Sequence, residues 1–208
     1  YAIITQTPMT STPTATPDLT FASAVGIFKA GDWWLGKPAG QSGDYGYVWY
    51  GGAGSIPVVG DWDGDGKDSP GIYNNGDWWL LNDYGEPFSE QHVWYGGPGW
   101  IPIPGDWDGD LNDSPGIFQA GNWWLHGDMW GDDPEEYVWY GDSTFTPVVG
   151  DWDGDWRDSP GIYKAGDWWL HSDVGQSDPE QFAVYGDATW KPVAGDWNGD
   201  GKDAPGVF

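Results

Sequence analysis

The sequence predicts an all-β protein, a four-bladed β-propeller preceded by an N-terminal extended segment. Three observations lead to this fold class. The chain repeats with a period of 45 residues, each repeat holds four short strand-like segments separated by turn-forming residues, and no segment has helical periodicity. Four strands in about 45 residues is the size of one propeller blade.

The period can be read at three landmarks in the 208-residue chain. The glycine before each acidic loop stands at positions 60, 105, 150 and 195. The motif DWWL or NWWL starts at positions 32, 77, 122 and 167, and VWYG starts at 48, 93 and 138 before it degrades to AVYG at 183. No insertion or deletion breaks this register between residues 26 and 208.

The second repeat illustrates the four strands of a blade: IPVVGDW, PGIYNN, DWWLLN and EQHVWYG. Consecutive apolar residues, such as Trp33-Trp34-Leu35, suit a sheet with neighbours stacked on both faces, whereas a sandwich with one wet face would alternate more cleanly. The repeats open at a second strand, GIFKAG, and close with a first strand, KPVAGDWNGDG, plus PGVF. We therefore expect the C-terminal first strand to complete the N-terminal blade, with Gly206 to Phe208 as a surplus strand that is either the closing partner or an open edge.

The amino-acid composition argues against two classes of binding partner and against disorder. The chain has 33 acidic and 7 basic residues and a formal charge of −26, so nucleic acid and anionic lipid should be repelled. No apolar run is long enough for membrane insertion. The 19 Trp, 11 Tyr and 7 Phe argue against disorder despite the charge. Cysteine is absent, which excludes disulfides and thiolate metal sites, and the start at Tyr1 suggests a processed mature form.

The acidic loop GDWDGDGKDSPGIY crowds four carboxylates into eight positions. Asp61, Asp63 and Asp65 occupy loop positions 1, 3 and 5, which converge when a loop curls, and hard oxygen ligands of this kind suit Ca²⁺. The carbonyl of Lys67 at position 7 could add a ligand, and Asp68 at position 8 could close the site directly or through water. Position 12 is Ile or Val and never the Glu of an EF-hand. The alternative is a solvated acidic turn without metal, in which clustered carboxylates would repel one another.

The sequence GDWDGDGKDSPGIY followed by GDWWL resembles the FG-GAP/VCBS-type calcium-binding repeat of integrin α-subunit propellers and bacterial extracellular proteins. The resemblance covers residues 26 to 208. It implies an extracellular or cell-surface protein of prokaryotic type, with up to four Ca²⁺ ions in the hairpins between the first two strands of the blades. With positions 7 and 8 included, the candidate metal residues are Asp61, Asp63, Asp65, Lys67, Asp68; Asp106, Asp108, Asp110, Asn112, Asp113; Asp151, Asp153, Asp155, Arg157, Asp158; Asp196, Asn198, Asp200, Lys202 and Asp203.

Two departures from the family pattern matter. The family places its last aspartate at position 9, where this chain has Ser or Ala, so direct ligation by the position-8 aspartates is open. Position 6 is Leu111 in the second loop and Trp156 in the third. A left-handed backbone would be strained at these residues, so we expect these two loops to bind calcium more weakly or to curl differently.

Other residues favour packing over chemistry. The Trp pairs of the WW motifs are expected to pack between blades, and the irregular Trp100, Trp130, Trp156 and Trp190 are better candidates for stacking on sugars. The histidines form no cluster at metal spacing, and Glu135 with Glu136 is an uninformative pair in so acidic a chain. Near-identical blades also argue against an asymmetric active site, so we predict no catalytic residues and no enzyme.

Residues 1–24 form a separate N-terminal segment before the propeller of residues 25–208. The segment contains a tract that resembles O-glycosylated stalks, with candidate sites at Thr10, Ser11, Thr12, Thr14 and Thr16. The stretch YAIITQT has strand-forming residues. It either joins a blade of the next subunit, which would build a head-to-tail fibre, or folds back on its own domain.

These observations favour a non-catalytic extracellular module, structural or adhesive, that self-associates into a surface or secreted fibre. The alternative is a lectin-like, carbohydrate-binding propeller or the binding module of a secreted enzyme.

Overall fold

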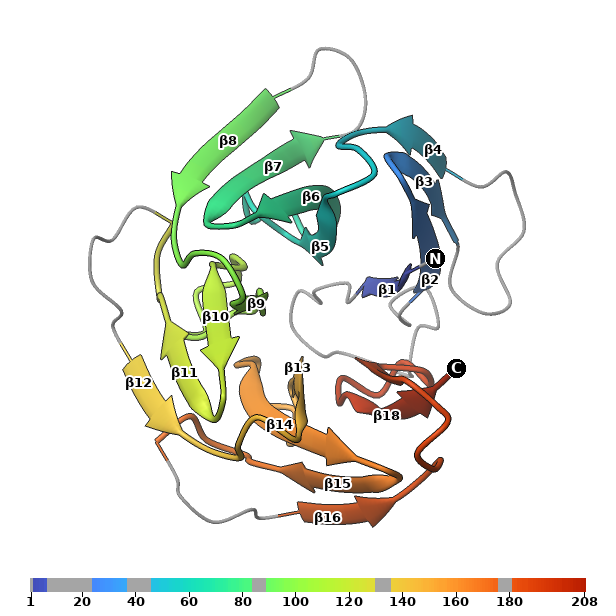
Figure 1. The fold of residues 1–208 in the computed structure, drawn as a ribbon, viewed down its shortest axis with the longest axis vertical. Coiled ribbons are helices and arrows are strands. Elements are labelled where there is room, and N and C mark those ends of the chain that lie inside the picture. The colour runs from blue at the N-terminus through green and yellow to red at the C-terminus, as the bar shows by residue number, and fades with distance from the viewer. Residues whose placement is uncertain (1, 7–23, 37–45, 84–88, 130–135, 176–180) are drawn as a thin grey trace.

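The computed structural model describes residues 2–6, 24–36, 46–83, 89–129, 136–175 and 181–208. These residues form strands, turns and bends, with no helix among them. The sheets follow one another around a ring (Figure 1), and four of them are the antiparallel, four-stranded blades of a β-propeller. The predicted fold class is therefore confirmed. Within the described ranges no helix reaches the length and hydropathy needed to cross a bilayer.

Each blade pairs its strands in the order in which they follow along the chain. The blades are β1 (Ala2–Gln6), β2 (Ala24–Lys29), β3 (Asp32–Leu35) and β4 (Gly46–Trp49); β5 (Ile56–Gly60), β6 (Ser69–Asn74), β7 (Asp77–Asp83) and β8 (Ser89–Trp94); β9 (Ile101–Pro102), β10 (Gly116–Gln119), β11 (Asn122–Leu125) and β12 (Glu136–Trp139); β13 (Thr146–Gly150), β14 (Ser159–Lys164), β15 (Asp167–Leu170) and β16 (Gln181–Val184). A separate two-stranded sheet contains β17 (Pro192–Gly195) and β18 (Ala204–Val207).

Closure of the ring differs from the expectation. The C-terminal strand β17 does not complete the N-terminal blade, because β1 pairs with β2 there, with Ile4 opposite Gly26. Strand β18 pairs with β17 over Ala204–Val207, and no described strand pairs with its other side, so of the two alternatives for this strand the open edge is the one observed. The two-stranded sheet lies next to the first blade in the ring (Figure 1), and β17 contacts both β13 and β1. The N-terminal segment thus contributes a strand to the propeller, upstream of the expected boundary at residue 25.

A tight turn joins the second and third strands of every blade. In the first blade, Ala30 and Gly31 have φ angles of 53° and 101°, which is the pattern of a type I′ hairpin turn. Asn75-Gly76, Ala120-Gly121 and Ala165-Gly166 repeat the pattern. Asn tolerates a positive φ and Ala does so at a cost, so the second blade has the best-matched turn.

The first tryptophan of each WW pair builds the core of its blade. Trp33, Trp78, Trp123 and Trp168 are fully buried, and each indole Nε1 donates to the carbonyl of the tyrosine that follows the outer strand, at 2.9–3.0 Å. The second tryptophan is less enclosed, since Trp34 and Trp79 keep 39% and 37% of their surface exposed. Trp124 and Trp169 are partly buried and pack against the core cluster of the preceding blade. The expectation that both members pack between blades therefore holds in the third and fourth blades, whereas in the first two blades it holds clearly only for the first tryptophan.

One aliphatic side chain per repeat packs across each junction between blades. Ile72 belongs to the hydrophobic core cluster of the first blade, Ile117 to that of the second and Ile162 to that of the third, and the partly buried Val207 packs against that of the fourth. These residues stand at loop position 12, where an EF-hand places its bidentate Glu. The position is therefore used for packing, and the burial of these side chains stabilises the stack of blades.

Candidate metal centre

The four acidic loops connect the first two strands of successive sheets. The first loop follows β5 at Gly60 and precedes β6 at Ser69, and the third and fourth occupy the same place after β13 and β17. The second follows the short β9 and is flanked by the bridge between Gly105 and Ser114. A tryptophan at position 2 closes each loop, because its Nε1 donates to the carbonyl of the residue at position 9, as Trp62 does to Ser69 at 2.9 Å.

The aspartate at position 1 organises the loop around itself. One carboxylate oxygen of Asp61 accepts hydrogen bonds from the backbone N–H of Gly64 (2.8 Å) and Asp65 (3.1 Å), and the other accepts from Gly66 (2.8 Å). Asp106, Asp151 and Asp196 make the same three contacts in their own loops. The curl therefore comes from the sequence itself, because a buried carboxylate gathers the amides of the turn.

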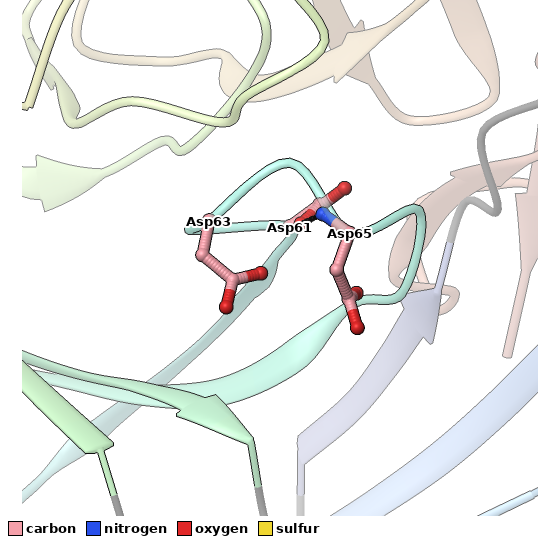
Figure 2. A group of neighbouring side chains, drawn as sticks. All are labelled: Asp61, Asp63 and Asp65. Atoms are coloured by element: carbon pink, nitrogen blue, oxygen red, sulfur yellow. Dashed lines mark hydrogen bonds between the residues drawn. The ribbon is translucent and has the colours of Figure 1, made fainter.

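This curl brings the carboxylates of positions 1, 3 and 5 together. In the first three loops each aspartate offers an oxygen within 4.8 Å of those of the other two. Figure 2 shows the first group, in which the carboxylates of Asp63 and Asp65 point to the same side of the loop. Three converging carboxylates form a hard, anionic donor set that fits Ca²⁺.

The fourth loop differs at position 3, where Asn198 replaces aspartate. Its amide Nδ2 donates to Asp200 at 3.0 Å, and its Oδ1 accepts from the backbone N–H of Asp200 at 2.9 Å. The loop keeps its shape with one negative charge fewer. A cation there would meet a weaker field than in the other three loops.

Positive φ angles at positions 4 and 6 complete the turn. Gly64 and Gly66 have φ angles of 72° and 81°. Leu111 and Trp156 at position 6 adopt 75° and 73°, so the expectation that these loops curl differently is wrong. The carboxylate at position 1 accepts the N–H of both residues, at 3.0 Å and 2.9 Å, and this bond holds the strained conformation in place.

The aspartate at position 8 reaches the loop of the preceding repeat. The Oδ2 of Asp113 accepts from the backbone N–H of Asp61 at 2.8 Å, while the N–H of Asp113 donates to the carbonyl of Asp61 at 2.8 Å. Asp158 and Asp106 repeat the pair of bonds, as do Asp203 and Asp151. We call this reciprocal pair of bonds the loop clasp. The Oδ2 atom of each of these three position-8 aspartates is thus directed across the junction between sheets.

The residue at position 7 also acts across junctions in two of the repeats. Arg157 Nη2 donates to the carbonyl of Trp107 at 2.6 Å, and Lys202 Nζ donates to the carbonyl of Asp153. Lys67 instead forms a salt bridge with Asp65 in its own loop, at 2.6 Å. Asn112 uses its backbone N–H, which donates to Asp110 at 2.8 Å. The side chains of Lys67, Arg157 and Lys202 therefore contribute hydrogen bonds and positive charge beside the triads.

Burial raises the pKa of several aspartates at positions 1 and 8 of the loops. It raises the pKa of Asp106 to about 6, against the opposing effect of the amide donors of its own loop. The pKa of Asp158 rises to about 7, first through burial and then through the neighbouring Asp106 and Asp151. The pKa of Asp113 and that of Asp203 also lie well above the usual range, for the same reasons. Buried carboxylates that lie beside other carboxylates are stabilised by a bound cation or by protonation.

The remaining candidates lie elsewhere. Trp100 packs against Trp124 with ring centroids 4.5 Å apart, and Trp190 is 46% exposed. The buried His126 and His171 meet Tyr95 and Tyr140 edge to face. Trp130, Glu135 and the candidate glycosylation sites Thr10, Ser11, Thr12, Thr14 and Thr16 lie outside the described residues.

A feature that the sequence analysis missed is a row of exposed tryptophans on the outer strands. Trp49, Trp94 and Trp139 are each 67–68% exposed and pair across the sheet with Asp32, Asp77 and Asn122. The VWYG motif contained the signal, because its valine faces the core, buried at Val48 and Val138 and partly buried at Val93, and an alternating strand must then expose the next residue.

Comparison with protein-family models, with curated proteins and with solved structures finds no match for this chain. The resemblance to the FG-GAP/VCBS repeat therefore stays a prediction.

Proposed function

We propose that the protein is a non-catalytic, extracellular structural module whose blades are stabilised by Ca²⁺ in the acidic loops. The observation that carries the proposal is the convergence of three carboxylates in each of three loops, within 4.8 Å of one another. The same arrangement recurs at the same place in successive repeats, which suits a structural ion. An active site would be expected to break the repeat.

Calcium binding can be tested by titration and thermal unfolding of the metal-free protein. Ca²⁺ that binds only the native state adds RT ln(1 + [L]/Kd), or about 2.7 kcal/mol at 100-fold excess over Kd for one site. We expect a large rise in Tm with Ca²⁺ and a smaller one with Mg²⁺, which dehydrates reluctantly. Asp108→Asn should remove one strong site.

Asp142→Asn is the matched control for this measurement. Asp142 lies outside the loops and caps a turn by accepting the N–H of Thr144, a role that Asn can keep. A chain that binds no Ca²⁺ in calorimetry, with the same Tm in chelator and in Ca²⁺, would refute the proposal.

Assembly into a fibre is the second part of the proposal. Strand β1 pairs with β2 through five residue pairs, and 17 residues separate the two strands in the sequence. A neighbouring chain could supply the same strand in the same register, because exchange of an identical element preserves every pairing. Exchange in one direction from chain to chain gives an open, head-to-tail series.

A cysteine pair distinguishes exchange from folding back, since the chain has no cysteine of its own. Thr5 lies opposite Val25 in the β1–β2 register, so Thr5→Cys with Val25→Cys should form a disulfide across this pair. Exchange predicts covalent oligomers in non-reducing gels of the assembled protein. Disulfides confined to single chains would refute it. The control pair, Trp34→Cys with Tyr47→Cys on β3 and β4, should stay within one chain in either case.

A second candidate function is carbohydrate binding, and the exposed outer-strand tryptophans favour it. Trp49 lies opposite Asp32, whose carboxylate accepts a hydrogen bond from Tyr47 at 2.7 Å. An exposed indole beside a polar acceptor resembles a surface that stacks on a sugar ring while bonding its hydroxyl groups. Glycan-array binding that is lost in Trp94→Ala and kept in Val184→Ala would support this function.

A further inference from the structure

A cavity of about 360 Å³ lies among the first strands of the repeats. Apolar residues of β5, β13 and β17, such as Val58, Val148 and Val193, line part of its wall. The aspartates at positions 1 and 8 of all four acidic loops line it as well. The cavity therefore gathers eight carboxylates, and no Lys or Arg of the described residues lines it.

One of these carboxylates has an oxygen without a partner. Asp203 is only 8% exposed, and its Oδ2 accepts from the backbone N–H of Asp151 at 3.2 Å. Its Oδ1 is buried and has no hydrogen-bond partner among the described residues. A buried acceptor that lacks a partner is costly, and in an anionic cavity the group that satisfies it best is a cation or its hydration shell.

The nearby basic side chains of the loops are engaged elsewhere. Arg157 donates to the carbonyl of Trp107, Lys202 donates to the carbonyl of Asp153, and Lys67 pairs with Asp65. The protein thus concentrates negative charge around the cavity and supplies no matching positive charge from the residues that line it.

We propose that this cavity is a cation site distinct from the acidic loops, in which Asp113, Asp158 and Asp203 hold a hydrated divalent cation. Each of these aspartates uses Oδ2 for the clasp, which leaves Oδ1 for the ion or its waters. A hydrated ion fits better than a bare one, because these three carboxylates, unlike those of the loop triads, do not form a group with oxygens within 4.8 Å of one another. The ion would draw successive sheets together around the cavity.

The test compares two sets of variants by equilibrium dialysis with Mn²⁺ and with Ca²⁺. The cavity variant carries Asp113→Asn, Asp158→Asn and Asp203→Asn; Asn keeps an oxygen to accept the clasp N–H while it removes the charge. The loop variant carries Asp63→Ala, Asp108→Ala, Asp153→Ala and Asn198→Ala. We expect the cavity variant to lose one equivalent of metal and keep the loop sites, and the loop variant to retain one equivalent.

The proposal is overturned if the cavity variant binds as many equivalents as the unchanged protein, or if a folded loop variant binds none. If the loop variant does not fold, the anomalous signal of Mn²⁺ in crystals of the unchanged protein decides: a peak among the three clasp aspartates supports the site, and peaks confined to the loops refute it. The inference goes beyond the proposed function, and the two can fail separately. If the acidic loops bind no metal, the equivalents assigned to the loops are lost while the one assigned to the cavity remains.

Discussion

The junctions between repeats and the seam where the ring closes are built differently. At three junctions, a position-8 aspartate clasps the preceding acidic loop, as Asp113 clasps Asp61, and an aliphatic residue packs across. At the seam, β1 contacts both β5 and β17, and this strand comes from outside the 45-residue repeat. One repeat unit thus specifies its contact with the next, but a separate strand is used to close the ring.

The largest effect is expected at the seam. Removal of residues 1–6 deletes β1, so β2 loses its ladder partner and β5 and β17 lose a neighbour. We expect the free energy of unfolding to fall by about 3–5 kcal/mol, or Tm by roughly 10 °C or more. Calorimetry measures this change, and the synthetic peptide YAIITQ should restore part of the lost stability. An unchanged Tm would mean that β1 does not close the ring.

A smaller loss is expected at a clasp. Asp158→Ala leaves the backbone N–H of Asp106 without its acceptor, at a cost of about 1–3 kcal/mol, whereas Asp158→Asn keeps an acceptor and should cost less. Denaturant unfolding in chelator measures both variants. Asp113→Ala and Asp203→Ala should behave alike, since the junctions are equivalent. Equal stability of the Ala and Asn variants would contradict the clasp.

The clasps also predict how stability depends on pH in chelator. The folded-state pKa values of Asp158, about 7, and Asp106, about 6, exceed the value near 3.9 of an unfolded chain. Between those limits the native state binds more protons than the unfolded state, so stability falls as pH rises from about 4 through 7.

Saturating Ca²⁺ should weaken or reverse this trend, because protons then compete with the ion for the same carboxylates. Tm measured from pH 5 to 8, with chelator and with Ca²⁺, gives both slopes. Asp158→Asn should flatten the slope in chelator. A Tm in chelator that rises over this range would show that these carboxylates are ionised in the native state.

The smallest effect is expected at the hairpin turns. Ala120 has a φ angle of 52°, whereas the equivalent residue of the second blade, Asn75, suits its φ angle of 53°. Ala120→Asn should therefore stabilise the protein by about 0.5 kcal/mol, and Asn75→Ala should destabilise it by a similar amount. Denaturant midpoints of the two variants should move in opposite directions, and a shift in the same direction would contradict the argument.

The parts of the structure that repeat could be predicted from the sequence. The blades, the hairpin position of the acidic loops and the approach of Asp61, Asp63 and Asp65 all follow from a 45-residue period with turn residues at fixed places. Closure could not be predicted, because YAIITQT matches no repeat, whereas the C-terminal KPVAGDWNGDG has the pattern of the first strand that GIFKAG lacks. The loop that the Asp113 carboxylate contacts could not be predicted either, because spacing along the chain does not show whether a carboxylate points to its own loop or to the neighbouring one.

The position of β1 has a consequence for the folding pathway. Its neighbours β2 and β5 follow early in the chain, but β17 lies nearly 190 residues away. Hairpins within each blade are local and can form quickly, while the β1–β17 contact needs almost the whole chain to be in place. Refolding should therefore end in a slow step of ring closure, during which the open edges of the first and last sheets are exposed to association with other chains.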